Sequence, residues 1–115
     1  MTLNRIGWAL AAYPALLIAL QAIFAAHVVA ALGRCPRYGY DRFDGIVGGH
    51  QWWTGRASLV LPVVLGVWLL LSPVIAFRSG RDQLQRQFGL IVVAFVAWWG
   101  WFAVDPCGFW NWWLD

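Results

Sequence analysis

The sequence predicts an all-α integral membrane protein that forms a single domain with three transmembrane helices. Of its 115 residues, 62% are hydrophobic and only 11% are charged, whereas about a quarter of the residues of an average soluble domain are charged. A bilayer core requires roughly 20 helical residues, and three uncharged stretches approach or exceed this length, at residues 6–32, 57–77 and 88–104. Ten tryptophans favour the same class, because indole rings concentrate at membrane interfaces.

The first predicted helix, residues 6–32, is unusually long. Its 27 uncharged residues would extend about 40 Å as a helix, so we expect it to tilt, protrude or bend at Pro14. The stretch is too long for a cleaved signal peptide, and only Arg5 precedes it. Small side chains recur on one face at spacings of three and four: Ala11, Ala15, Ala19, Ala22, Ala26 and Ala30. We expect this face to pack within the bundle, against another subunit's helix, or against lipid.

The second and third predicted helices, residues 57–77 and 88–104, also carry small residues and prolines. Proline is tolerated inside a membrane helix where a hydroxyl or a neighbouring helix satisfies the freed carbonyl, and the second helix contains Pro62 and the pair Ser72-Pro73. The third helix is expected to end before Asp105-Pro106. Further packing positions are Ser58, Pro62 and Gly66 in the second helix, and Gly89, Ala97, Gly100 and Ala103 in the third.

Three polar segments remain outside the predicted helices. The first loop, residues 33–56, has 24 residues and contains several aromatic side chains, which disordered segments usually lack, so we expect a structured cap. The connection at residues 78–87 is predicted to be a tight turn. In the tail, residues 105–115, the segment from Phe109 to Leu114 is expected to lie along the membrane interface as a short helix.

Two cysteines are predicted to meet at one membrane face. With three crossings, the first loop and the carboxyl terminus lie on the same side, which places Cys35 and Cys107 together. An oxidising compartment would allow a disulfide between them; the alternative is two buried free thiols. Arginines are divided equally between the two sides, but Arg78, Arg81 and Arg86 form the densest cluster. The positive-inside rule therefore favours a cytoplasmic amino terminus and a periplasmic first loop.

Two polar side chains of the first predicted helix are the candidate cofactor-binding residues. His27 lies near the end of the helix, where an imidazole can bind haem iron or the magnesium of a chlorin, or can form an ordinary interfacial hydrogen bond. Gln21 lies nearer the middle and needs a partner, either another helix or the carbonyl of a quinone or pigment. No metal site is predicted, because His27, His50, Cys35 and Cys107 lack ligand spacing.

The tryptophans are distributed unevenly along the chain. All except Trp8 and Trp68 are expected near the end that carries the first loop and the tail: Trp52, Trp53, Trp98, Trp99, Trp101, Trp110, Trp112 and Trp113. An aromatic belt at the headgroup level accounts for about half of the tryptophans. Because such a belt normally marks both interfaces, the asymmetry also indicates a surface for partner subunits, lipids, or planar ligands such as quinones, chlorins or carotenoids.

The predicted function is that of a non-catalytic accessory subunit in a larger inner-membrane complex of bacteria or organelles. Respiratory or photosynthetic electron-transfer complexes and light-harvesting complexes are the favoured classes. No nucleophile with a matching base, phosphate loop or intramembrane carboxylate pair is present, and the charge of +3 is too small for nucleic-acid binding. The alternatives are a small quinone- or haem-binding redox protein, and a homo-oligomeric transporter or channel.

Overall fold

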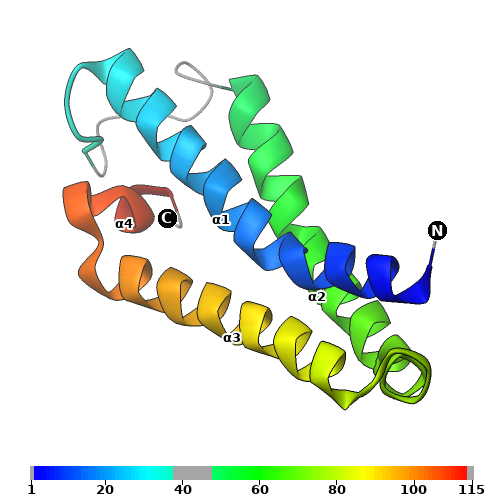
Figure 1. Ribbon diagram of the computed structural model, residues 1–115. Coiled ribbons are helices and arrows are strands. Elements are labelled where there is room, and N and C mark those ends of the chain that lie inside the picture. Colours follow the sequence, from blue (N-terminus) through cyan, green and yellow to red (C-terminus); the bar gives the residue numbers. More distant parts are fainter. Residues whose placement is uncertain (1, 38–47, 114–115) are drawn as a thin grey trace.

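The structure, a computed structural model, describes residues 2–37 and 48–113 and contains three long helices (Figure 1). These are α1 (Leu3–Leu32), α2 (Gly48–Ser79) and α3 (Arg81–Val104). A 3-10 turn, η1 (Pro106–Gly108), and a short helix, α4 (Phe109–Trp113), follow α3. Each of the three long helices is long and apolar enough to cross a membrane, which confirms the predicted all-α class and its three candidate spans.

Helix α1 begins and ends at residues that suit helix termini. The Oγ of Thr2 accepts a hydrogen bond from the backbone N–H of Arg5 at 3.4 Å, so the helix starts at Leu3 and not at residue 6. Gly33 follows the last turn with a φ of 68°, a left-handed conformation that glycine adopts without steric cost. The helix continues through Pro14.

Helix α2 extends well beyond the predicted span at residues 57–77, because it begins at Gly48 and ends at Ser79. Hydropathy marks where a helix leaves lipid, but no proline separates Gln51 from Arg56, so the helix continues into the polar segment despite Gly55. The Ser72 hydroxyl donates to the Leu69 carbonyl at 2.7 Å. This carbonyl is the one that Pro73 leaves without a backbone donor, so a hydroxyl satisfies it, as predicted.

The connection between α2 and α3 is far shorter than the predicted residues 78–87. Only Gly80 separates the two helices, and its φ of 92° permits the sharp reversal. The residues from Arg81 to Gln87, which were expected to belong to this connection, are helical. Most of them are arginine, glutamine or leucine, which are good helix formers. The predicted loop at 33–56 is also shorter than expected, because α2 begins at Gly48. Residues 38–47 of this loop lie outside the described part of the chain.

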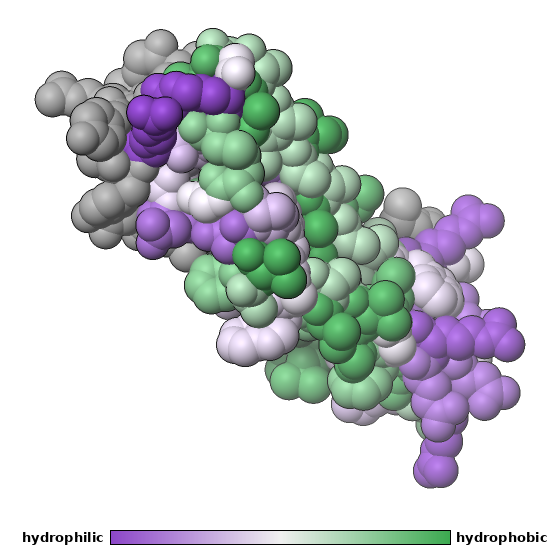
Figure 2. All heavy atoms as spheres, turned by 90° about the vertical axis from the view of Figure 1, so that its left-hand side faces the viewer, coloured by the Kyte–Doolittle hydropathy of each residue, from purple (hydrophilic) through white to green (hydrophobic). Residues whose placement is uncertain are grey.

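The helices form an elongated bundle that is wedge-shaped in Figure 1. The first turn of α1 and the turn between α2 and α3 lie at one end, here called the turn end (Figure 1). The last turn of α1, the start of α2, η1 and α4 lie toward the other end, here called the cap end (Figure 1). Helix α1 packs against both α2 and α3, and α4 occupies the opening between α1 and α3 at the cap end (Figure 1). Figure 2 shows polar residues at both ends and an apolar band between them, along a long axis of 53 Å.

The buried face of α1 changes character along the helix. It consists of Gly7, Ala11, Pro14, Leu17, Gln21, Phe24 and Val28. Small residues lie toward the turn end, where the helices converge, and larger residues lie toward the cap end, where α4 fills the opening. Most of the predicted alanine face does not pack within the bundle: Ala11 is buried and Ala15 half-buried, whereas Ala19, Ala22, Ala26 and Ala30 are exposed. Its contact with lipid or with another subunit stays a prediction.

The other small residues contribute little to the bundle core. Ser58 and Gly89 are half-buried, and the remaining predicted packing positions are exposed: Pro62, Gly66, Ala97, Gly100 and Ala103. The helices instead pack through aromatic, branched and amide side chains, because the bundle opens toward the cap end and small residues cannot fill that space.

Candidate functional site

Gln21 of α1 joins all three helices through hydrogen bonds. Its Oε1 accepts from the indole N–H of Trp98 on α3 at 3.1 Å, and its Nε2 donates to the Ser58 hydroxyl of α2, also at 3.1 Å. Ser58 in turn donates to the Thr54 carbonyl at 2.8 Å. The interhelical role considered for Gln21 is therefore present in the structure. Such bonds help to hold helices together inside a membrane, because helices surrounded by lipid gain nothing from burial away from water.

Gln87 of α3 forms a second junction of the same kind near the turn end. Its Oε1 accepts from the indole N–H of Trp68 on α2 at 3.0 Å, and its Nε2 donates to Asn4 of α1 at 3.1 Å. Gln87 is fully buried. Gln87 was not among the predicted site residues, because residues 78–87 were expected to form a turn. The spacing of Gln87, Ile91 and Ala94 at four and three residues places them on one helix face, and this spacing could have indicated that Gln87 is buried on α3.

Gly7 allows the Gln87 junction to form. A Cβ atom at this position would lie 2.7 Å from Oε1 of Gln87 and 2.8 Å from Cδ1 of Ile75, both fully buried side chains. Gln87 cannot withdraw freely, because it is bonded to Trp68 and Asn4. The absence of a side chain at Gly7 is therefore a packing requirement.

We expect Gly7→Ala to destabilise the bundle by about 1–3 kcal/mol, the usual cost of overpacking a filled core. The measurement is the midpoint of unfolding in a titration of mixed micelles with denaturing detergent. Gly66→Ala is the matched control, since nothing lies within 4 Å of the added methyl group. Equal midpoints for the two variants would contradict the packing role of Gly7.

An apolar cavity of about 200 Å³ lies beside Gln21. All three long helices contribute to its lining: Pro14, Leu17, Ile18, Gln21, Ser58, Leu61, Ala94, Phe95 and Trp98. The polar groups of the lining residues Gln21, Ser58 and Trp98 are hydrogen-bonded to one another. The cavity can therefore accept a small apolar molecule from the membrane, with an amide at its wall for one further hydrogen bond.

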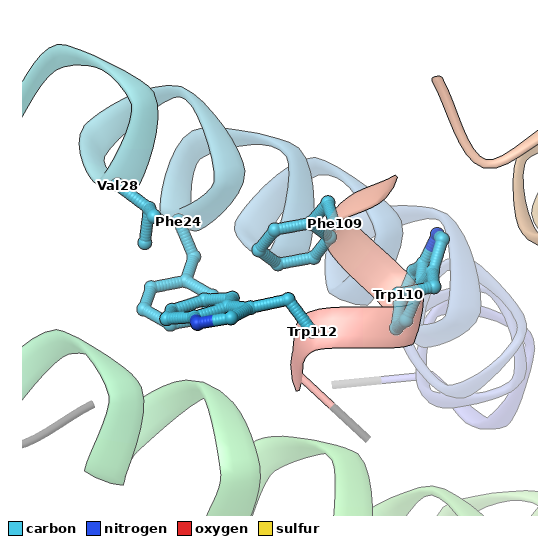
Figure 3. Close-up of a cluster of buried hydrophobic side chains, with 5 residues drawn as sticks. All are labelled: Phe24, Val28, Phe109, Trp110 and Trp112. Carbon is cyan, nitrogen blue, oxygen red and sulfur yellow. The ribbon is translucent and has the colours of Figure 1, made fainter. Parts of the chain in front are cut away.

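The carboxyl-terminal aromatic residues form a buried cluster with α1 and α3. Figure 3 shows Phe109 and Trp112 reaching from α4 toward Phe24 and Val28 of α1, whereas Trp110 leaves the opposite side of α4. Phe109 packs edge-on against Phe24 at a centroid distance of 5.6 Å. Trp110 contacts Trp101 of α3 at 4.8 Å, and within the described structure its indole N–H has no hydrogen-bond acceptor.

This cluster shows how the tail packs on the bundle, whereas its position along a membrane interface stays a prediction. The predicted short helix exists as α4, but Phe109, Trp110 and Trp112 are buried, because α4 fills the opening between α1 and α3. Trp98, Trp101 and Trp113 pack against the same cluster. Leu114 lies outside the described residues. Much of the tryptophan asymmetry therefore reflects internal packing.

A disulfide and an acidic cap fix the orientation of α4. Cys35 and Cys107 are joined, with a Cα to Cα distance of 5.3 Å, which confirms the predicted pairing. The carboxylate of Asp105 accepts hydrogen bonds from the backbone N–H groups of Trp110 at 2.8 Å and Asn111 at 3.2 Å. These contacts satisfy backbone groups that a helix start leaves free. The chain reverses here through residues with positive φ, at Asp105, Cys107 and Gly108.

The histidines are not brought together with Gln21. His27 is exposed on α1 and does not line the cavity. His50 belongs to the first turn of α2, and its side chain lies outside the described part of the structure. Among the described residues, no group of three histidine, cysteine or acidic side chains has a geometry suited to a metal ion.

The remaining predicted contact residues lie on the surface. Trp52, Trp53 and Trp99 are exposed, and the ring of Trp52 lies under the guanidinium of Arg56 at 4.3 Å. Together with the exposed alanines of α1, these side chains are available to lipid or to a partner. Comparisons of the chain with protein-family models, curated protein sequences and solved structures found no match.

Proposed function

We propose that the chain is a non-catalytic accessory subunit of a larger membrane protein complex. The exposed side of α2 is the observation that supports this most. Only 11% of its most apolar 18-residue stretch is buried, compared with 22% in α1. Large apolar side chains cover that side: Leu59, Val60, Val63, Val67, Leu69, Leu70, Val74 and Phe77. In a membrane, such a surface contacts lipid and can receive the helices of a partner.

The use of the interior polar groups also supports a structural role. Gln21 and Gln87 each connect three helices, and both amides are hydrogen-bonded within the chain. Polar side chains used in this way rigidify a bundle. A rigid bundle with an apolar exterior is suited to supporting neighbouring subunits, and exposed rings such as Trp53 and Trp99 suit the cofactor-rich surfaces of electron-transfer or light-harvesting complexes.

The proposal includes an inner-membrane location with the turn end in the cytoplasm. Arg78, Arg81 and Arg86 cluster at that end, as the positive-inside rule requires of a cytoplasmic connection. The disulfide lies at the opposite end, which we place in an oxidising periplasm or an equivalent compartment.

Purification from the native membrane in mild detergent tests the proposal. We expect larger subunits to copurify in fixed stoichiometry, and we expect Gly66→Leu on the exposed side of α2 to abolish this association without changing the stability of the isolated chain. Gly100→Leu on α3 is the control, because both glycines are exposed with no atom near the added group. A free wild-type chain without partners would contradict an accessory role.

A quinone-binding role is the second candidate, favoured by the cavity beside Gln21. A ring bearing a carbonyl would suit an apolar cavity of about 200 Å³ with an amide at its wall. Ala94→Phe should fill the cavity and abolish retention of a short-chain quinone by the purified protein, whereas Ala97→Phe, at an exposed position on the same helix, should leave retention unchanged. Equal retention by the two variants would exclude this site.

A further inference from the structure

Four exposed arginines gather at the turn end, on all three long helices. Arg5 lies in the first turn of α1, Arg78 in the last turn of α2, and Arg81 and Arg86 in the first two turns of α3. Asp82 is the one acidic residue among the described residues at this end. Four positive charges and one negative charge leave a local excess of +3.

The packing of α1 on α3 fixes this arrangement. Asn4 accepts a hydrogen bond from Gln87 at 3.1 Å, and Trp8 donates to Gln83 at 3.3 Å. Arg5 and Arg86 are the chain neighbours of the bonded pair Asn4 and Gln87, so their backbones are held in the same layer of the bundle. The single-residue turn at Gly80 brings the end of α2, with Arg78, next to the start of α3.

The arginines at the two ends of the molecule differ in what they contact. At the cap end, Arg34 donates to the Cys35 carbonyl at 2.9 Å, and Arg56 lies over the ring of Trp52. Arg37 is also engaged within the chain. At the turn end, by contrast, none of the four guanidinium groups forms an ion pair or a side-chain hydrogen bond with any described residue. Their donors are therefore available to an external anion.

Exposed aromatic side chains follow these arginines closely in the sequence, toward the apolar band. Phe77 precedes Arg78 and is 91% exposed. Phe88 lies two residues beyond Arg86 and is 56% exposed, although its ring also stacks on Trp68 at 6.4 Å. A ligand that fits both features has an anionic phosphate group at the membrane surface and hydrocarbon chains that extend into the apolar band. Basic clusters at the ends of membrane helices attract anionic lipids for this reason.

We propose that the turn end binds the headgroup of an anionic phospholipid. The guanidinium groups of Arg5, Arg78, Arg81 and Arg86 contact the phosphate, and the acyl chains pack beside Phe77 and Phe88. The site does not depend on the identity of any protein partner. It also does not depend on which compartment the turn end faces, because both leaflets present phospholipid headgroups.

Lipid binding to the purified chain in uncharged detergent tests the site by native mass spectrometry, with phosphatidylglycerol and phosphatidylcholine as probes. Arg81→Gln with Arg86→Gln should weaken phosphatidylglycerol binding by up to about 30-fold, which corresponds to the loss of two exposed ion pairs at the upper end of their usual strength. The control pair is Arg34→Gln with Arg37→Gln at the cap end, which should leave the binding within about twofold. Far-ultraviolet circular dichroism verifies that both double variants keep their helix content.

Three results would overturn the proposal. Equal binding of phosphatidylcholine would show that apolar contact alone holds the lipid. Equal weakening by the Arg34 and Arg37 substitutions would show that overall charge, and not the turn end, attracts it. Thermal stabilisation by inorganic phosphate equal to that by phosphatidylglycerol would identify the ligand as a free anion. Selective loss of phosphatidylglycerol in the Arg81 and Arg86 variant would support the site.

Discussion

Phe109→Ala is expected to destabilise the protein by about 3–5 kcal/mol, the usual cost of removing a buried aromatic ring. Phe109 is only 2% exposed, and its ring lies between α1 and α3, where it contacts Phe24 at 5.6 Å and stacks on Trp101 at 6.0 Å. Helix α4 lies in the opening between α1 and α3 at the cap end (Figure 1). Removal of the ring would leave a cavity and release α4 from α1.

The measurement is the free energy of unfolding in mixed micelles titrated with denaturing detergent. Phe77→Ala is the matched control, since it makes the same chemical change at a position that is 91% exposed, and surface changes usually alter stability by less than about 0.5 kcal/mol. Similar losses for Phe109→Ala and Phe77→Ala would show that α4 is not part of the core.

Loss of the disulfide should produce the second large effect. The bond between Cys35 and Cys107 closes a long segment of the chain, and chain entropy gives such a closure roughly 4 kcal/mol as an upper value. We expect a smaller loss here, because a membrane or micelle around three helices of this length and hydropathy would restrain them in the unfolded chain as well. The Cys35→Ser and Cys107→Ser double variant should therefore have a lower thermal midpoint than the wild type.

Reduction provides the control for this experiment. A reductant should lower the midpoint of the wild-type protein to that of the double variant and should leave the double variant unchanged. A wild-type midpoint that does not respond to complete reduction would contradict a stabilising role for the bond. The Asp105 contacts to Trp110 and Asn111 would then be the main restraint on α4.

The sequence predicted the spans and the cysteine pair because both follow from simple physical constraints. An uncharged stretch of sufficient length predicts a helix in lipid regardless of its neighbours. The odd number of such stretches then places Cys35 and Cys107 at the same end, where the structure joins them. Gln21 was also identifiable, because an amide in an apolar helix requires a partner.

The helix ends and the packing faces were not predictable in the same way. Hydropathy reports where lipid ends, and it does not detect that α2 continues back to Gly48 or that α3 starts at Arg81. The alanine pattern of α1 satisfies the spacing rule, yet the bundle uses the face that contains Gly7, Gln21 and Phe24. That choice depends on α4 filling the cap end, which is a tertiary contact that local spacing cannot show.

The burial of α4 could not be predicted from the composition of the tail. A segment with four aromatic residues resembles an interfacial helix when it is considered alone. In the structure, the disulfide and the turn at Asp105 direct it back against α1. The distribution of tryptophans is therefore partly a consequence of internal packing, and only exposed rings such as Trp53 and Trp99 are available to partners.

Cysteine accessibility in intact cells tests most directly whether the turn end and the cap end lie on opposite sides of a membrane. After reduction, a membrane-impermeant maleimide should label Cys35 and Cys107 of the wild-type protein. In a Cys35→Ser and Cys107→Ser background, Asp82→Cys at the exposed start of α3 should be labelled only after the cells are opened. Labelling of Asp82→Cys from the same side as Cys35 and Cys107 would contradict the three-span architecture.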